Sequence, residues 1–372
     1  MKIFFTLILS VCCFFYSFAQ ILPKGQYFEA GFNVGKIYKH SPKIVIPLSE
    51  LKPVLGAELT WEMKTFGKKH WNQLNGYPRL GFIYSFQAFR DDRLGWGMGL
   101  MPFVSGRFFK IGPVELFGRM AMGISYVSKH YDAYTNPENN IIGSHINSNV
   151  AFRLGLGIDV HKKIELRPSF SFTHYSNGAS QFPNLGINVM SFHLGVLYKD
   201  NPITEEDKIK HEKSAPKKGK VIFNPVFGIG IKEIGRTYRG PKFPVILSSL
   251  EAGLFLSRNN MFKIGVTHEY NASDYAFVNN NVGGISQSAV EKANRFLFYI
   301  DDEISLGHIS IIGQIGYYFN NAPVKLPFTR IGFKVYPLDP VKNRIAPYIG
   351  LRLKAHAITA EYFDLIFGCL IR

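Results

Sequence analysis

Cysteine is scarce in this chain, and long apolar runs are confined to its N-terminus. Only three cysteines occur among 372 residues, and two of them, Cys12 and Cys13, lie in the apolar N-terminal segment. The third, Cys369, has no partner in the rest of the chain, which excludes an intrachain disulfide framework. No later apolar run is long enough for a transmembrane helix. These absences exclude both a small disulfide-stapled domain and a helical membrane protein.

The N-terminal segment, MKIFFTLILSVCCFFYSFAQ, has the features of a secretory signal peptide. It carries one Lys, an apolar core and the small residues Ser17 and Ala19 near its end. We therefore predict a signal peptide over residues 1–19, cleaved after Ala19, and export of the mature chain.

Acidic residues are outnumbered by basic ones, which gives the chain a net charge of +16. An exported chain with no basic helix and no aromatic-basic platform is not expected to bind nucleic acid. Two explanations of the excess stay open: Lys and Arg scattered over loops, or attraction to a phosphate-bearing glycolipid surface. The spacing of His130, His145 and His356 is not that of metal ligands, so no metal site is predicted.

Apolar and polar residues alternate over long segments of the first half, with 35 Gly, 33 Phe and 19 Tyr in the whole chain. Successive residues of a β-strand point to opposite faces, so this alternation predicts strands. The segments exceed the usual length of soluble strands, about five or six residues, and their second face mixes Gly with charges of both signs, as a narrow barrel lumen requires. An all-β, antiparallel outer-membrane barrel is therefore predicted. Its strands are expected over 26–38, 53–64, 78–88, 95–108, 112–127, 148–160, 163–175 and 188–199.

The second half resembles a degenerate copy of the first. Residues 187–199, INVMSFHLGVLYK, parallel 360–372, AEYFDLIFGCLIR. Strands are expected near 220–234, 245–257, 261–270, 294–305, 307–319, 327–336, 345–356 and 358–371. We predict a signal peptide (1–19), a first barrel (20–200), a charged linker (201–219) and a second eight-stranded repeat (220–372). Two barrels and one barrel of sixteen strands both remain possible.

Loop lengths predict how the first barrel is oriented. Barrels place short turns in the periplasm and long loops outside; the turns near 108–113 and 160–163 are short, whereas 39–52 and 128–147 are long. The seventh strand is thus expected to end at the outer rim. The connection over 65–77 does not fit, because it should be periplasmic and yet is long.

The end of the seventh strand carries a base and a hydroxyl on its apolar face. In KIELRPSFSFTHYS, which begins at Lys163, His174 and Ser176 continue the outward face of Phe170 and Phe172. An imidazole near a hydroxyl can activate it as a nucleophile, and a third group should orient the imidazole. Asn188 has the outward parity of the next strand and is expected to face His174 across the sheet.

The stretch FTHYSNGASQFPNLGIN, residues 172–188, resembles the outer-membrane lipid A 3-O-deacylases, the PagL-like family, and the resemblance extends over about residues 20–200. It implies an eight-stranded outer-membrane barrel whose site lies on the outer wall, with His174 as general base and Ser176 as nucleophile. Asn177 and Asn184 would lie at the oxyanion hole. The implied reaction is hydrolysis of the ester-linked 3-hydroxyacyl chain of lipid A in lipopolysaccharide, without metal or cofactor.

One position departs from the family. Its best-known members have Glu where this chain has Asn188, and Asn can hold a His tautomer but cannot stabilise an imidazolium by charge. The alternative is an inactive outer-membrane barrel that acts as a pore or an assembly protein. The second half carries only HAIT where the first has the motif loop, and the sequence does not indicate the oligomeric state.

Overall fold

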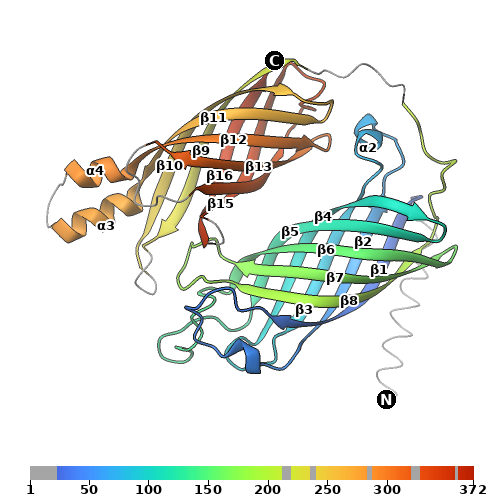
Figure 1. The fold of residues 1–372 in the computed structure, drawn as a ribbon, viewed down its shortest axis with the longest axis horizontal. Coiled ribbons are helices and arrows are strands. Elements are labelled where there is room, and N and C mark those ends of the chain that lie inside the picture. The colour runs from blue at the N-terminus through green and yellow to red at the C-terminus, as the bar shows by residue number, and fades with distance from the viewer. Residues whose placement is uncertain (1–22, 212–218, 235–239, 283–286, 320–326, 357–358) are drawn as a thin grey trace.

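The computed structural model describes residues 23–372 except 212–218, 235–239, 283–286, 320–326 and 357–358. The predicted signal peptide, 1–19, lies outside the described residues. The chain forms two closed antiparallel barrels of eight strands each, which decides between the two arrangements that the sequence left open (Figure 1). Within the described residues, no helix is long and apolar enough to cross a membrane.

The first barrel follows the chain strand by strand and closes where its first and last strands, β1 and β8, pair. Its connections carry a short 3₁₀ helix, η1 (Leu48–Glu50), and a short α-helix, α2 (His70–Leu74). The strands are β1 (Gln26–Ile37), β2 (Val54–Lys64), β3 (Arg79–Ala88), β4 (Trp96–Ile111), β5 (Val114–Val127), β6 (Ile146–His161), β7 (Ile164–Ser176) and β8 (Ile187–Lys199).

The second barrel has the same order and closes where β16 pairs with β9. Two helices, α3 (Ala272–Val282) and α4 (Gln287–Ala293), project from the end at which the long loops of the first barrel also lie (Figure 1). The strands are β9 (Val221–Glu233), β10 (Lys242–Phe255), β11 (Asn260–Asn271), β12 (Asn294–Ser305), β13 (Ile309–Tyr318), β14 (Phe328–Val335), β15 (Ile345–His356) and β16 (Thr359–Ile371).

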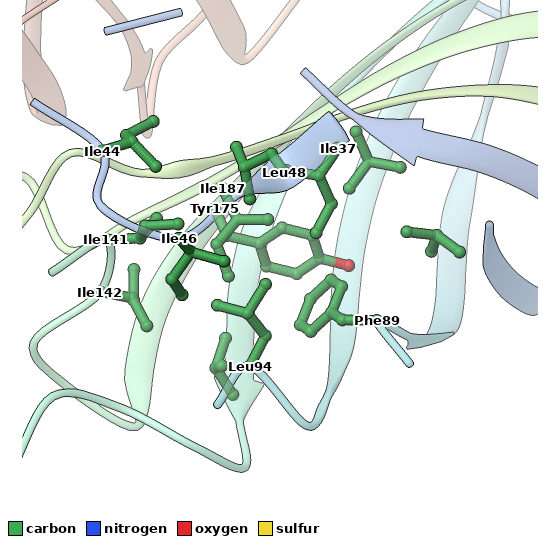
Figure 2. Close-up of a cluster of buried hydrophobic side chains, with 13 residues drawn as sticks. Ile37, Ile44, Ile46, Leu48, Phe89, Leu94, Ile141, Ile142, Tyr175 and Ile187 are labelled. Carbon is green, nitrogen blue, oxygen red and sulfur yellow. The ribbon is translucent and has the colours of Figure 1, made fainter. Parts of the chain in front are cut away.

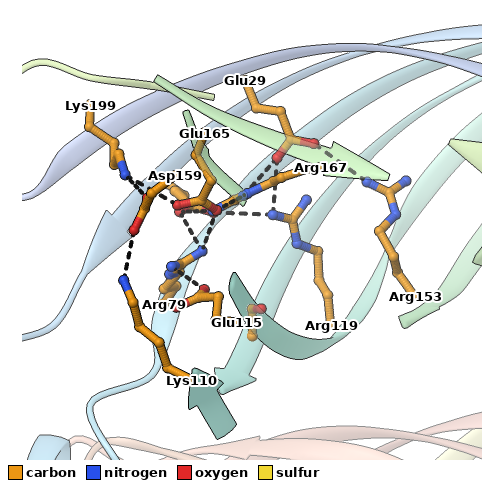
Figure 3. Close-up of polar contacts among 12 residues, drawn as sticks. Glu29, Arg79, Lys110, Glu115, Arg119, Arg153, Asp159, Glu165, Arg167 and Lys199 are labelled. Atoms are coloured by element: carbon orange, nitrogen blue, oxygen red, sulfur yellow. Dashed lines mark hydrogen bonds and ion pairs between the residues drawn. The ribbon is translucent and has the colours of Figure 1, made fainter. Parts of the chain in front are cut away.

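Charged side chains fill the lumen of the first barrel, while apolar side chains cover its outside. Arg167 is fully buried and lies 2.8 Å from Glu29, 2.9 Å from Glu62 and 2.7 Å from Glu165 (Figure 3). His193, which points into the lumen from β8, contacts Glu29 at 2.9 Å and Asn33 at 2.8 Å. Buried charges are tolerated when they are paired and hydrogen-bonded, so the network replaces an apolar core.

The lumen of the second barrel is filled in the same way. The Lys263 ammonium lies 2.7 Å from Asp301 and 2.6 Å from Glu303, and all three side chains are buried. Arg352 pairs with Asp364 at 2.5 Å further along the lumen. Both barrels are therefore closed cylinders packed with ion pairs.

An apolar cap closes the first lumen at the end that carries the long loops, which the loop lengths predict to be the outer end (Figure 2). The cap consists of buried side chains from the strand ends and from the long loops: Ile37, Ile44, Ile46, Leu48, Val54, Phe89, Leu94, Val127, Ile141, Ile142, Tyr175, Ile187 and Val189. Tyr175 lies among them, and its hydroxyl donates a hydrogen bond to Gln87 at 3.1 Å. The loop over 39–52 is long because it folds inward to supply part of this cap.

The unexpectedly long connection over 65–77 packs against the second barrel. Asn259 Nδ2, between β10 and β11, donates a hydrogen bond to Asn75 Oδ1 at 2.8 Å. A side chain added at Gly307, between β12 and β13, would meet Trp71 at 2.7 Å. The connection over 65–77 is therefore long because it makes contact with the second barrel.

Replacing Arg167 with Met should destabilise the first barrel strongly, because three buried carboxylates would lose a shared cation. Breaking a buried pair from one side costs about 3–5 kcal/mol. The exposed pair of Lys163 and Asp200, 3.9 Å apart, provides the control, and Lys163→Met should cost less than about 1 kcal/mol. Urea titration of heat-modifiable electrophoretic mobility measures the stability of both variants. Equal losses of stability would contradict the role of Arg167 as the shared cation of the three carboxylates.

Candidate active site

Strand register carries His174 and Asn188 to the same place on the outer wall. In the β7–β8 pair, His174 lies opposite Asn188 and Tyr175 lies opposite Ile187. Tyr175 and Ile187 point into the apolar cap and are fully buried. Because neighbours along a strand point to opposite faces, His174 and Asn188 are turned outward, as the sequence predicted.

The imidazole of His174 is held by the side chain of Asn188. His174 Nδ1 lies 2.5 Å from Asn188 Oδ1. An amide oxygen only accepts, so Nδ1 carries the proton and Nε2 keeps a lone pair that can act as a base. Gly186 also packs against this ring, since a Cβ at Gly186 would lie 2.6 Å from His174 Cε1 and 3.4 Å from His174 Nδ1.

Ser176 shares the outward parity of His174 but is covered rather than exposed, with only 2% of its surface accessible. The segment 177–186, here called the site loop, lies over it. Asn184 Nδ2 donates a hydrogen bond to Ser176 Oγ at 3.0 Å, and the backbone N–H of Gly178 donates another at 3.1 Å. The loop therefore surrounds the hydroxyl with polar groups and covers it.

The two asparagines of the site loop have different surroundings. Asn184 contacts Ser176, and its Oδ1 accepts a hydrogen bond from the Asn177 backbone N–H at 3.0 Å. The Asn177 side-chain amide is engaged elsewhere, donating to Ser144 Oγ at 2.9 Å and to the Gln181 carbonyl at 2.7 Å. Asn177 thus fixes the loop with its side chain and presents its backbone near Ser176.

The Gly178 N–H is a donor that sequence reasoning missed. Gly178 adopts a positive φ of 63°, which glycine adopts without steric cost. The resulting turn brings its N–H back to the hydroxyl two residues earlier. A Ser-x-Gly sequence just beyond a strand end could have indicated this contact.

The five predicted residues form two hydrogen-bonded groups. One consists of His174 and Asn188, and the other of Ser176, Asn177 and Asn184. No hydrogen bond joins the described His174 ring to Ser176 Oγ. Transfer of the hydroxyl proton to His174 therefore requires Ser176 Oγ to leave Asn184, an adjustment that catalytic groups commonly make when substrate binds.

An apolar groove of about 1080 Å³ runs along the outer wall below these residues. The next outward pair in the register, Phe172 opposite Met190, lines its upper part. Phe170 and Phe192 continue it, and Ile304 of the second barrel forms part of one side. The groove is lined mostly by apolar side chains, and its Phe172–Met190 pair lies next to His174 and Asn188 on the outer wall.

Within the described residues, no group of three or more His, Cys, Asp or Glu side chains is placed to hold a metal ion. The polar groups that surround Ser176 are uncharged amides and backbone N–H groups. The chemistry that this arrangement offers is nucleophilic attack assisted by a base and by hydrogen-bond donors.

Gly186→Ala should separate His174 from Asn188, because the new methyl group would overlap the imidazole. Gly76 is the matched control: its φ of 69° resembles the 86° of Gly186, but nothing lies within 4 Å of its Cβ position. Both variants lose about 1–2 kcal/mol of folding stability, because the alanine must adopt a left-handed backbone conformation. Only Gly186→Ala should slow the reaction of Ser176 with a fluorophosphonate, and equal rates in both variants would refute the contact.

Comparisons with known proteins connect this site to a family. Residues 55–196 match the family model of lipid A 3-O-deacylase (PagL). The crystal structure of the outer membrane enzyme PagL is 16% identical, with coverage of 45% of this chain and 97% of that chain and a TM-score of 0.31. Neisserial surface protein A is 11% identical, with coverage of 47% and 97% and a TM-score of 0.34. No curated protein sequence matches.

The matched range runs from β2 to β8 and includes all five candidate side chains. It covers seven of the eight strands of a closed barrel whose outside is apolar. Residues 55–196 of the first barrel therefore resemble the lipid A 3-O-deacylase (PagL) family, and the chain is a β-barrel protein of the outer membrane.

Proposed function

We propose that this protein is a serine esterase of the outer membrane that removes the ester-linked 3-hydroxyacyl chain of lipid A. His174 is the general base, Ser176 is the nucleophile and Asn188 orients the imidazole. Asn184 and the N–H groups around Ser176 supply the oxyanion donors. In this proposal residues 20–200 form the catalytic domain, 201–219 the linker and 220–372 a second barrel without the motif.

The observation that carries the proposal is the outward pairing of His174 with Asn188 above an apolar groove. A lipid substrate in the outer leaflet can place its acyl chain along Phe172 and Met190 while its ester lies at the level of His174. The narrow lumen is filled by ion pairs and offers no space for a chain. A site on the wall avoids that restriction.

The reaction proceeds through an acyl-enzyme. Ser176 Oγ attacks the ester carbonyl carbon while its proton passes to His174 Nε2, and the oxyanion accepts hydrogen bonds from the site loop. His174 then returns the proton to the departing sugar oxygen, which breaks the carbon–oxygen bond. Water, activated by the same imidazole, hydrolyses the acyl-serine and releases the hydroxy fatty acid.

Asn188 supports this chemistry by orientation alone. Its Oδ1 holds the Nδ1–H tautomer, so the basic nitrogen of His174 is the one that remains available. Without a negative charge at this position, the imidazolium that forms during attack receives less stabilisation than a carboxylate would give. We expect a slower enzyme than one with an acidic residue there.

The pore alternative is disfavoured by the contents of the lumens. Buried ion pairs occupy both barrels, and the apolar cap closes the outer end of the first. An assembly role with an inactive motif remains the outcome that the following experiment would reveal if the enzyme proposal fails.

Ser176→Ala should abolish deacylation, because the nucleophile is lost. Removing a catalytic serine lowers kcat by about 10⁴-fold or more. Ser180→Ala, in the same loop, is the control and should keep wild-type activity. Mass spectrometry of lipid A from cells expressing each protein gives the result: one 3-hydroxyacyl mass lost with wild type and Ser180→Ala only. Identical spectra from all three would refute the proposal.

Asn188→Ala should slow the reaction by about 10–100-fold, the equivalent of losing an orienting hydrogen bond worth about 1–3 kcal/mol. Asn188→Glu should restore the rate or exceed it, because a carboxylate both orients the ring and stabilises its protonated form. Initial rates on purified lipid A measure both variants. An unaffected Asn188→Ala protein would remove Asn188 from the mechanism.

A further inference from the structure

The second barrel touches the site loop at the outer end of the molecule. Phe182 N–H donates a hydrogen bond to the carboxylate of Glu233 at 2.6 Å, and Glu233 N–H donates to the Ala179 carbonyl at 3.5 Å. A Cβ added at Gly178 would lie 2.2 Å from the ring of Phe363, so the glycine packs directly on β16. The loop that surrounds Ser176 is thus held partly by the ends of β9 and β16.

A cleft of about 550 Å³ opens at this contact. The first barrel contributes two imidazoles, a hydroxyl and an amide, and the second contributes a lysine at the start of β10. The described residues that line the cleft are His130, Ser144, His145, Gln181, Gly240 and Lys242. None of these lining residues is acidic, so the cleft combines cationic and neutral donors.

The two imidazoles are oriented by the backbone. His130 Nδ1 donates to the Tyr131 carbonyl at 2.5 Å, and His145 Nδ1 donates to the Val127 carbonyl at 2.7 Å. A carbonyl oxygen only accepts, so Nδ1 is the protonated nitrogen of each neutral ring. The rings lie edge to face with centroids 4.2 Å apart. Among the residues that the structure describes, neither Nε2 has a backbone partner, so both nitrogens are available to a group bound in the cleft.

Lys242 supplies the permanent charge of the cleft. Its side chain is exposed, and no ion pair of its ammonium is found among the described residues. The carboxylate across the strand pair, Glu233, is buried and accepts the Phe182 N–H. The Lys242 ammonium interacts electrostatically with Glu233 but forms no direct ion pair with it, so beside two imidazoles it can still attract an anion.

The cleft is joined to the candidate active site by the side chain of Asn177. Its amide donates to Ser144 Oγ at 2.9 Å and to the Gln181 carbonyl at 2.7 Å, and both of those residues line the cleft. Ser176 is the residue that precedes Asn177 in the chain. A group bound in the cleft and an ester at Ser176 would therefore lie on either side of one asparagine.

We propose that the cleft between the barrels binds a phosphate group of the glycolipid substrate, with Lys242 of the second barrel as its principal cation. This inference rests on the proposed function for the identity of the ligand. The cleft faces the outer end, where phosphorylated headgroups lie, while the acyl groove of the same substrate runs down the wall. The second barrel, which lacks the catalytic motif, thereby completes the binding site of the first.

Binding is tested separately from hydrolysis by using the full-length Ser176→Ala protein in nanodiscs. The ligands are bisphosphorylated lipid A and the same lipid A after removal of both phosphates. Lys242→Ala should weaken binding of the phosphorylated lipid about tenfold, as expected for loss of a charge-assisted contact. It should leave binding of the dephosphorylated lipid unchanged. Lys242→Arg should retain binding, and Lys292→Ala on exposed α4 is the control lysine.

Equal binding of both lipids by the Ser176→Ala protein would overturn the proposal, as would equal weakening of both by Lys242→Ala. Competition by inorganic phosphate would support an anion site that accepts free phosphate as well as the headgroup. Lack of competition with preserved discrimination would support a site specific for the headgroup. If discrimination persists while the wild-type protein fails to deacylate lipid A, the phosphate cleft stands and only the proposed hydrolysis is lost.

Discussion

The packing of Tyr175 against Ile187 inside the apolar cap determines where the candidate site lies. These two residues face each other in the β7–β8 pair and are fully buried. The outward neighbours, His174 and Asn188, are brought opposite each other by the same register. A slip of one residue would turn the imidazole into the lumen and Tyr175 into lipid, so the buried pair specifies which face carries the candidate site. The loop over 39–52 matters to the site because it helps to build the cap.

The barrels reverse the distribution of polarity found in soluble proteins. Phe170, Leu194 and Ile231 are exposed on the outer walls, whereas Arg167 and Arg352 are fully buried inside. Apolar side chains are as stable against lipid as in a protein core, so they can cover the outer walls. The charged side chains inside the lumen are stabilised by ion pairs and hydrogen bonds with one another. Polar groups on the outer wall therefore need hydrogen-bond partners and cover from nearby loops. Ser176 obtains it from Asn184 and Gly178 rather than from a protein core.

Much of this arrangement could be predicted from the sequence, because it depends on local alternation. The alternation of apolar and polar residues predicts the strands of both barrels and the outward direction of His174, Ser176 and Asn188. Helices α3 and α4 were not predicted, since neither shows a strong apolar period. The burial of Ser176 was missed because it depends on how the site loop folds back. The contacts of Asn75 with Asn259 and of Gly178 with Phe363 join residues that are far apart in the sequence, and no periodicity encodes such pairs.

The contacts between the barrels occur at both ends, through Asn75 near the short turns and through Gly178 near the long loops. A single contact would act as a pivot, whereas two contacts separated along the barrel axis prevent one cylinder from tilting or sliding relative to the other. The two barrels should therefore share one depth and one inclination in the bilayer. Local thinning of the membrane around either barrel would affect both, and the height of the candidate site in the bilayer would be set by the hydrophobic belts of the two barrels together.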